Sequence, residues 1–268
     1  MYSNVRGIKG KKASLTETVH EFNHHIFLIT ETQLRSNNGV SIEGYTFYSK
    51  CRTSANGGGV GILIRNDIKM NVTPHVSDRE TELMWISLRR KNLPPLIIGT
   101  YYGKQENKTT KAEIEREMML LNEEIAEMKA DGEILLAMDG NAKIGILGEP
   151  ISRNGSLLLR VVEDNDLTIM NKSVKCKGKV TRENTKNAEE KSAIDYIITS
   201  KSIEEWIENM VIDEEGTAKI RGKTESDHNT IIIDLKVSDI DKTFRVKRTM
   251  REEPASTCRK MGGILRRA

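Results

Sequence analysis

The sequence predicts an α/β or α+β domain with β-sheets in its core. Short apolar runs of strand length alternate with a few helical segments, and 268 residues fit one large domain or two small ones. Hydrophobic residues make up 37% of the chain and charged residues 30%, which is within the globular range. No apolar run approaches the roughly 18 residues that span a bilayer, so no membrane span is expected.

The predicted elements follow from hydrophobic periodicity and from capping signals. Lys111–Lys129 is the longest predicted helix, because apolar residues recur at helical spacing until Asp131-Gly132 ends it. A first helix is predicted behind a capping box of Ser14 and Glu17, and another over Gly155–Asn165. The predicted strands are Ile26–Thr30, Val60–Arg65, Leu83–Arg89, Leu96–Tyr102, Glu133–Met138, Val180–Arg182, Ser192–Thr199, Glu208–Asp213 and Thr230–Val237.

The cysteines and the N-terminal residues indicate an intracellular protein. Three cysteines stand far apart without a Cys-x-x-Cys pair, which argues against a disulfide framework and a cysteine-based zinc site. Met1–Lys12 is basic, but no apolar segment follows it, so no secretory signal is predicted. We therefore expect a nuclear or cytoplasmic protein that is neither secreted nor transmembrane.

The formal net charge of +3 is unevenly distributed. Residues 242–268 contain nine Lys or Arg and two acidic side chains, whereas residues 1–241 are mildly acidic. We expect one domain over residues 1–238 and a basic, disordered tail over residues 239–268. Such a tail can bind polyanions without specificity.

One motif, His20-Glu-Phe-Asn-His24, matches the H-E-x-x-H pattern of zinc proteases. On a helix its two histidines would point away from the apolar stripe of Leu15, Val19, Phe22 and Ile26. A zinc-binding helix needs its histidines toward a cleft. We interpret these histidines as solvated surface residues.

A stronger signal comes from polar side chains at the ends of predicted strands. Glu31 and Asp139 each directly follow an apolar strand, and Asp195 lies within Ser192–Thr199. Asn4 lies near the start of the chain, and Ser226-Asp227-His228 precedes the last strand. Functional residues of sheet-based folds concentrate at such strand ends. Each of these residues alone also has an ordinary structural explanation.

Their order along the chain resembles the endonuclease/exonuclease/phosphatase superfamily. The closer resemblance is to the apurinic-like endonuclease domains of LINE-type (non-LTR) retrotransposons, and it runs from Asn4 to about Val237. It implies a four-layer α/β sandwich of two packed mixed β-sheets flanked by helices. The motifs that carry it are Asn4-Val-Arg-Gly7, Glu31-Thr32, Gly57-Gly-Gly-Val-Gly-Ile-Leu-Ile64, Tyr102-Gly-Lys-Gln-Glu106, Met138-Asp-Gly-Asn-Ala142, Lys179-Val-Thr-Arg182 and Ala193-Ile-Asp-Tyr-Ile197.

The sequence also departs from that family pattern. Met138, Gly140 and Lys104 replace the usual Gly, Phe and Pro, and the strand before Asn4 is reduced to Met1–Ser3. Because Tyr101 and Tyr102 are adjacent, either of them can face the site, since a slip of one residue reverses the face of a strand.

The resemblance implies a phosphodiesterase that uses Mg²⁺, or alternatively Mn²⁺, to nick duplex DNA and leave a 3′-hydroxyl. No obligate protein partner is evident. Two alternatives stay open. One is another phosphoesterase of the superfamily, acting on abasic-site DNA, RNA or a small phosphate ester. The other is a catalytically dead element remnant that acts at most as a binding module.

The resemblance also implies roles for individual residues. The implied catalytic residues are Asp139, Asn141, His228, Asp195 and Tyr102, with Asp195 holding the imidazole in one tautomer. The implied metal ligands are Glu31, Asn4 and Asp227. The implied substrate-binding residues are Thr181, Arg182 and Ser226. A hairpin over Arg182–Ser192 is expected to reach the DNA groove, and Lys219, Arg221 and Lys223 to lie near phosphates.

Overall fold

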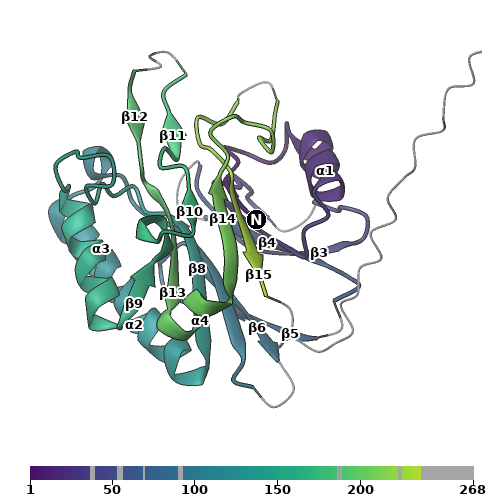
Figure 1. The fold of residues 1–268 in the computed structure, drawn as a ribbon, viewed down its shortest axis with the longest axis horizontal. Coiled ribbons are helices and arrows are strands. Elements are labelled where there is room, and N and C mark those ends of the chain that lie inside the picture. Colours follow the sequence, from purple (N-terminus) through teal and green to yellow (C-terminus); the bar gives the residue numbers. More distant parts are fainter. Residues whose placement is uncertain are drawn as a thin grey trace, which may run out of the picture.

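Two mixed β-sheets pack face to face, and helices cover the outer face of each sheet (Figure 1). The structure is a computed structural model that describes residues 1–36, 40–52, 57–68, 70–89, 93–185, 187, 189–222 and 225–236. The predicted basic tail, residues 239–268, and Lys223 lie outside the described residues. The two packed sheets with helices on their outer faces confirm the predicted four-layer α/β sandwich.

The first sheet has seven strands and the second has six. The order in the first is β10 (Cys176–Lys177), β14 (Ile207–Ile212), β15 (Ile231–Leu235), β1 (Tyr2–Asn4), β2 (Ile26–Thr30), β4 (Val60–Arg65) and β3 (Tyr45–Lys50). The order in the second is β5 (Asn71–Val76), β6 (Leu83–Arg89), β7 (Leu96–Tyr102), β8 (Glu133–Asp139), β13 (Asp195–Ser200) and β9 (Leu167–Ile169). A separate hairpin pairs β11 (Arg182–Glu183) with β12 (Lys191–Ser192) and projects beyond one end of the sandwich (Figure 1).

Four α-helices and two short 3₁₀ helices connect the described strands. The α-helices are α1 (Lys12–Glu21), α2 (Lys111–Asp131), α3 (Arg153–Asp164) and α4 (Lys201–Trp206), and the 3₁₀ helices are η1 (Glu106–Lys108) and η2 (Met170–Lys172). Among the residues that can be placed, no helix combines the length and the apolar character needed to cross a bilayer.

Three apolar layers hold the sandwich together. The central layer lies between the sheets and includes Leu28, Ile62 and Ile98. A second layer joins the six-stranded sheet to α2 and α3, and a third joins the seven-stranded sheet to α1. Each fully buried aliphatic side chain contributes roughly 1.5–3 kcal/mol relative to exposure, so these layers supply the main driving force for folding.

The short first strand lies in the middle of its sheet. All three residues of β1 pair in parallel with β2, and Tyr2 also pairs with Ile231 of β15. The strand covers Tyr2–Asn4 rather than the predicted Met1–Ser3, so it ends on Asn4 itself. Burial lowers the pKa of the Met1 amino group to about 5, and this group donates to the Ile26 carbonyl at 3.0 Å.

The predicted helices α1 and α2 are both present, but the start of α1 was predicted incorrectly. Thr110 and Glu113 form a reciprocal capping box at the start of α2. The predicted capping box of Ser14 and Glu17 is wrong, because α1 already begins at Lys12 without a side-chain cap. The Ser14 hydroxyl instead accepts a hydrogen bond from the Arg221 amide at 2.9 Å.

One carboxyl group on α2 faces inward. Glu117 is buried beside Tyr101, and its Oε2 accepts a hydrogen bond from the Lys104 amide at 3.3 Å. Burial raises the pKa of Glu117 from 4.5 to about 7. Between pH 4.5 and pH 7 the Glu117 carboxyl group is protonated in the folded chain but ionised in the unfolded chain. The contribution of Glu117 to the free energy of unfolding therefore falls as the pH rises toward 7.

We expect Glu117→Gln to become progressively more stable than the wild type between pH 4.5 and pH 8. The relative gain in the free energy of unfolding reaches about 3 kcal/mol at most, because each pKa unit corresponds to about 1.4 kcal/mol. Urea unfolding at pH 5 and pH 8 measures it, with Glu115→Gln on the exposed face as the control for losing one charge. An identical stability difference at both pH values would contradict the prediction.

Candidate active site

Sheet pairing brings the polar strand ends to one rim of the sandwich. Asp139, the last residue of β8, pairs with Tyr102 on β7 and with Asp195 on β13. In the facing sheet, β1 ends at Asn4 beside the end of β2, and Glu31 follows β2 directly. Because adjacent strands end at the same edge of the sheets, these residues lie close together although they are far apart in the sequence.

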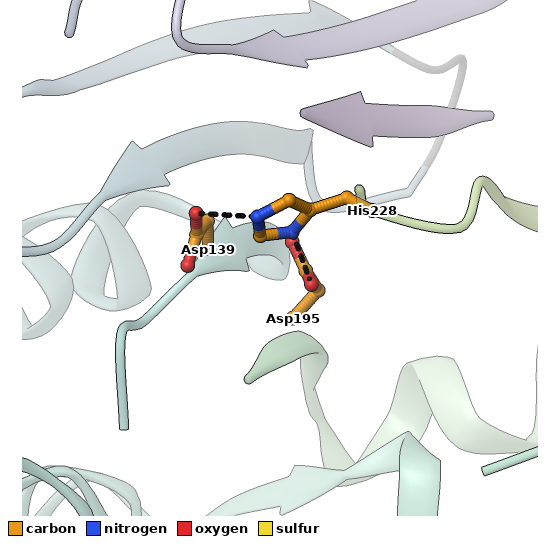
Figure 2. A group of neighbouring side chains, drawn as sticks. All are labelled: Asp139, Asp195 and His228. Atoms are coloured by element: carbon orange, nitrogen blue, oxygen red, sulfur yellow. Dashed lines mark hydrogen bonds and ion pairs between the residues drawn. The ribbon is translucent and has the colours of Figure 1, made fainter. Parts of the chain in front are cut away.

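Asp195 and His228 form a buried pair (Figure 2). Asp195 Oδ2 lies 2.8 Å from His228 Nδ1, and Asp195 Oδ1 accepts a hydrogen bond from the Tyr2 hydroxyl at 2.9 Å. Burial disfavours the imidazolium, but the carboxylates of Asp195, Asp139 and Asp227 outweigh it and raise the pKa of His228 to about 9. The imidazole is therefore oriented by a carboxylate and carries positive charge at neutral pH.

Asp139 faces the other nitrogen of the same imidazole, as Figure 2 shows. Its Oδ2 lies 3.8 Å from His228 Nε2 and accepts a hydrogen bond from Asn4 Nδ2 at 2.7 Å. Burial, together with the nearby charges of Asp195 and Glu31, raises the pKa of Asp139 to about 7. A carboxyl group in this range can exchange a proton near neutral pH.

Asn141 is held close to Asp139 by the turn that follows β8. Its amide donates to Asp139 Oδ1 at 3.1 Å, and its Nδ2 donates to the Gly103 carbonyl at 2.8 Å. Its φ of 44° lies in the left-handed region, which asparagine tolerates better than most residues other than glycine. The surrounding hydrogen bonds hold this conformation.

Asn4 links Glu31 to Asp139. Its Nδ2 donates to Glu31 Oε1 at 3.0 Å as well as to Asp139, so both carboxylates converge on one nitrogen. Glu31 is partly exposed, has a φ of 53° and lies 3.5 Å from Gln33 Nε2. Asn4 Oδ1 accepts a hydrogen bond from the Arg6 amide at 3.1 Å, so the partly exposed Glu31 carboxylate is the ligand that a hard divalent cation can reach in this group.

A second acidic group is less suited to a metal ion. Asp139, Asp195 and His228 each place one potential ligand atom within 4.8 Å of the others. Both oxygens of Asp195 already accept hydrogen bonds, however, and its side chain is 0% exposed. An ion there would have to break the Asp195–His228 pair, whereas one at Glu31 would leave it intact.

The adjacent tyrosines face opposite sides of β7. Tyr101 is buried against α2 beside Glu117, and Tyr102 faces the site. Burial and the charges of Glu31 and Asp139 raise the pKa of Tyr102, so its hydroxyl stays protonated and can donate a hydrogen bond. The Arg52 guanidinium lies 5.7 Å from the centre of the Tyr102 ring.

Asp227, a predicted metal ligand, pairs with two arginines. Its Oδ1 lies 3.1 Å from Arg6 Nη1, and its Oδ2 accepts from Arg182 Nε at 2.9 Å. Burial opposes its charge, but His228, Arg182 and Arg6 keep the pKa of Asp227 below its ordinary value. In this structure Asp227 binds two arginines at the rim of the site, and its role as a metal ligand stays a prediction.

Ser226 and Thr181 lie behind the site, where they shape its backbone. The Ser226 hydroxyl donates to the Asn4 carbonyl at 2.6 Å and accepts from the His228 amide at 3.2 Å. Thr181 is 0% exposed, and its hydroxyl accepts from the amides of Ile194 and Asp195. Both residues therefore hold catalytic candidates in place rather than presenting a surface to a substrate.

Two residues of the site, Tyr2 and Arg6, were not predicted from the sequence. Tyr2 extends from β1 to Asp195 in the opposite sheet, across 193 positions of sequence. Arg6 reaches Asp227 across 221 positions. No local pattern distinguishes these residues, because their importance comes only from the pairing of distant strands.

The rejected zinc motif is not held on one helix. Helix α1 ends at Glu21, and His24 lies beyond it, stacked on Phe22 with ring centres 6.0 Å apart. His20 is exposed, as expected, but His24 is half-buried, and burial lowers its pKa to about 3. The expectation that both histidines are solvated is therefore wrong for His24.

Three comparisons with known proteins agree with this geometry. Residues 1–131 match the model of the Endonuclease/Exonuclease/phosphatase family. The fold is similar to the endonuclease domain of TRAS1, a telomere-specific non-LTR retrotransposon (TM-score 0.68, 16% identity, 88% of this chain and 97% of that one). It is also similar to the AP endonuclease LMAP from Leishmania major (TM-score 0.72, 10% identity, 87% of this chain and 85% of that one).

A curated relative connects the sequence to mobile elements. The RNA-directed DNA polymerase from mobile element jockey of Drosophila funebris is 24% identical over 102 residues, which is 38% of this chain and 11% of that protein. The chain thus spans only a small part of that relative's length.

The fold is shared with nucleases and phosphatases of known structure, and the site combines a carboxylate–imidazole pair with a second carboxyl group. Residues 1–131 are thus similar to the Endonuclease/Exonuclease/phosphatase family, and the fold is similar to that of a retrotransposon endonuclease domain.

Proposed function

We propose that this domain is a Mg²⁺-dependent endonuclease that nicks duplex DNA. The observation that carries the proposal is the arrangement of the Asp195–His228 pair opposite Asp139, with Asn4 connecting Asp139 to Glu31. This arrangement places a charged imidazole, a second carboxyl group and an oxygen-rich cation site around one point. A phosphodiester needs these three groups for hydrolysis.

In the proposed reaction, water attacks phosphorus, and the bond to the 3′ oxygen breaks. The 3′ oxygen leaves as an alkoxide and takes a proton from solvent water, so the products are a 3′-hydroxyl and a 5′-phosphate. Asp139 takes the proton of the attacking water, and the His228 Nε2–H donates a hydrogen bond to the phosphate. Asp195 holds the imidazole through Nδ1, and the Tyr102 hydroxyl donates to another phosphate oxygen. Mg²⁺ at Glu31 and Asn4 would neutralise charge that develops on the phosphate.

The surface around the site supports a nucleic acid as the substrate. Arg6 and Arg182 lie at the rim with side chains 48% and 28% exposed. The β11–β12 hairpin begins at Arg182 and stands out from the same end of the sandwich (Figure 1). Exposed arginines and a projecting hairpin next to the site suit a duplex, because the backbone phosphates on either side of the cut can bind them.

The proposal is tested by incubating supercoiled plasmid with the purified protein, with Mg²⁺ and with EDTA. We expect open-circular product with Mg²⁺ only, and ends that a DNA polymerase extends without prior treatment. A folded protein that leaves the plasmid intact in Mg²⁺ and Mn²⁺ would contradict the proposal. A parallel assay with abasic duplex, RNA and a small phosphate monoester then identifies the preferred ester.

We expect Glu31→Gln to raise the Mg²⁺ concentration needed for half-maximal nicking by roughly 10- to 100-fold. The amide keeps the size of the side chain and its contact with Asn4, but it removes the charge that attracts the cation. A Mg²⁺ titration of the nicking rate measures the shift. Glu163→Gln, at an exposed position of α3, is the matched control. An unchanged titration would exclude Glu31 as a ligand.

A further inference from the structure

Asn154, at the start of α3, connects the two turns that carry Tyr102 and Asn141. Its Nδ2 donates to the Lys104 carbonyl at 2.8 Å and to the Asn141 carbonyl at 3.1 Å. Its backbone amide donates to Glu106 Oε1 at 2.5 Å. The side chain is 0% exposed, so these bonds form without competition from solvent.

Close backbone contacts surround this asparagine. The Gly103 amide donates to the Asp139 carbonyl at 2.8 Å, and a β-carbon at Gly103 would lie 2.7 Å from the Gly140 carbonyl oxygen. A β-carbon at Gly155 would lie 1.9 Å from the Lys143 carbonyl oxygen. Glycine is therefore required at both positions, and the two turns and α3 touch directly through their backbones.

Only one orientation of the Asn154 side-chain amide satisfies these hydrogen bonds. Both hydrogens of Nδ2 point at carbonyl oxygens, while Oδ1 accepts no hydrogen bond from any residue that the structure places. A carboxylate at this position would therefore face two carbonyl oxygens without a donor. An aspartate has the same size as asparagine, so Asn154→Asp reverses the electrostatics and leaves the packing unchanged.

We propose that Asn154 is a positioning residue that fixes the Tyr102 turn and the Asp139–Asn141 turn relative to each other. The inference rests on the proposed nuclease function, because it assigns the role through Tyr102 and Asn141. By bonding to the Asn141 carbonyl, Asn154 also supports the left-handed conformation of that residue. It contacts neither of the two carboxylates that bracket His228, so its effect on the reaction is indirect.

The test compares Asn154→Asp and Asn154→Ala with Asn165→Asp. Asn165 is also buried and donates through Nδ2 to a carbonyl, that of Val161, but it caps the opposite end of α3. The two ends lie about 17 Å apart at 1.5 Å per residue. All three variants lose a buried amide contact on the same helix, and only two of them lose it beside the site.

We expect Asn154→Asp to lower the kcat for plasmid nicking by roughly 30- to 100-fold, as a displacement of about 1 Å at a reacting centre does. The KM for plasmid and the Mg²⁺ midpoint should stay within about twofold, because the rim arginines and Glu31 are untouched. Asn165→Asp should keep the wild-type kcat at a temperature where circular dichroism shows both proteins folded. Equal kcat losses at both positions would indicate a merely structural role and overturn the inference.

A double-mutant cycle with Tyr102→Phe gives an independent readout. If Asn154 acts through the Tyr102 turn, Asn154→Asp should lower kcat much less in the Tyr102→Phe background than in the wild type. Additive losses would overturn the inference, and so would a wild-type kcat in folded Asn154→Asp. If Asn154→Asp does not fold, the same comparisons are made with Asn154→Ala. Failure of the wild-type protein to nick DNA would instead overturn the proposed function.

Discussion

Replacement of His228 by Ala is expected to reduce the nicking rate by about 10²–10³-fold, since loss of one hydrogen-bond donor to a reacting oxyanion has an effect of this size. The imidazole lies between Asp195 and Asp139, with Nδ1 2.8 Å from Asp195 Oδ2 and Nε2 3.8 Å from Asp139 Oδ2. Its removal deletes the donor that faces the phosphate in the proposed reaction. Single-turnover nicking of a labelled duplex at saturating Mg²⁺ measures the loss.

Two further variants keep this experiment interpretable. Truncation at position 228 leaves Asp195 as a buried charge with less compensation, which can cost several kcal/mol of stability. His228→Gln retains a hydrogen-bonding group, so it provides the result if the alanine variant unfolds. His20→Ala is the matched control, because His20 is exposed on α1 and belongs to the rejected zinc motif. Nicking at the wild-type rate by folded His228→Gln and His228→Ala would contradict the assignment of the site.

Asp139→Asn is expected to lower nicking by about 10³-fold while the protein stays at least as stable as the wild type at pH 8. Burial raises the pKa of Asp139 to about 7, so its ionised form costs stability above that pH. Asparagine removes this cost and retains an oxygen that can accept from the Asn141 amide. Loss of activity without loss of stability would separate chemistry from folding.

Nicking rates and thermal unfolding at pH 8 measure the two effects of Asp139→Asn together. Asp164→Asn, at an exposed position of α3, controls for the loss of one carboxylate. If Asp139→Asn nicks DNA as fast as the wild type, Asp139 has no role in proton transfer, and the proposed reaction is wrong.

Much of the secondary structure could be predicted from local sequence. The strands at residues 26–30, 60–65, 83–89 and 96–102 have the predicted bounds, because continuous apolar runs mark strands that are buried on both faces. β3 and β5 were missed, because these edge strands lack such runs: polar residues interrupt β3, and most residues of β5 are exposed. The capping box at Ser14 failed because a tertiary partner, the Arg221 amide, uses the same hydroxyl.

The sequence by itself determined which side chains end the strands of the site. Glu31, Asp139, Asp195 and His228 are recognisable there because a polar residue directly beside an apolar strand is a local signal. The order of these motifs also indicated the resemblance to the superfamily, since that order does not depend on how the sheets pair, and residues 1–131 match the family model. The division into residues 1–238 and a tail stays a prediction.

Only the tertiary structure decided which of these groups meet and which atoms they share. It placed Tyr102 rather than Tyr101 in the site, tied Asp227 to two arginines, and brought Tyr2 to Asp195 and Asn154 to the two turns. These contacts join residues up to 221 positions apart. They depend on sheet order and strand register, which follow from the packing of the whole core. Neither property can be predicted from any single position of the sequence.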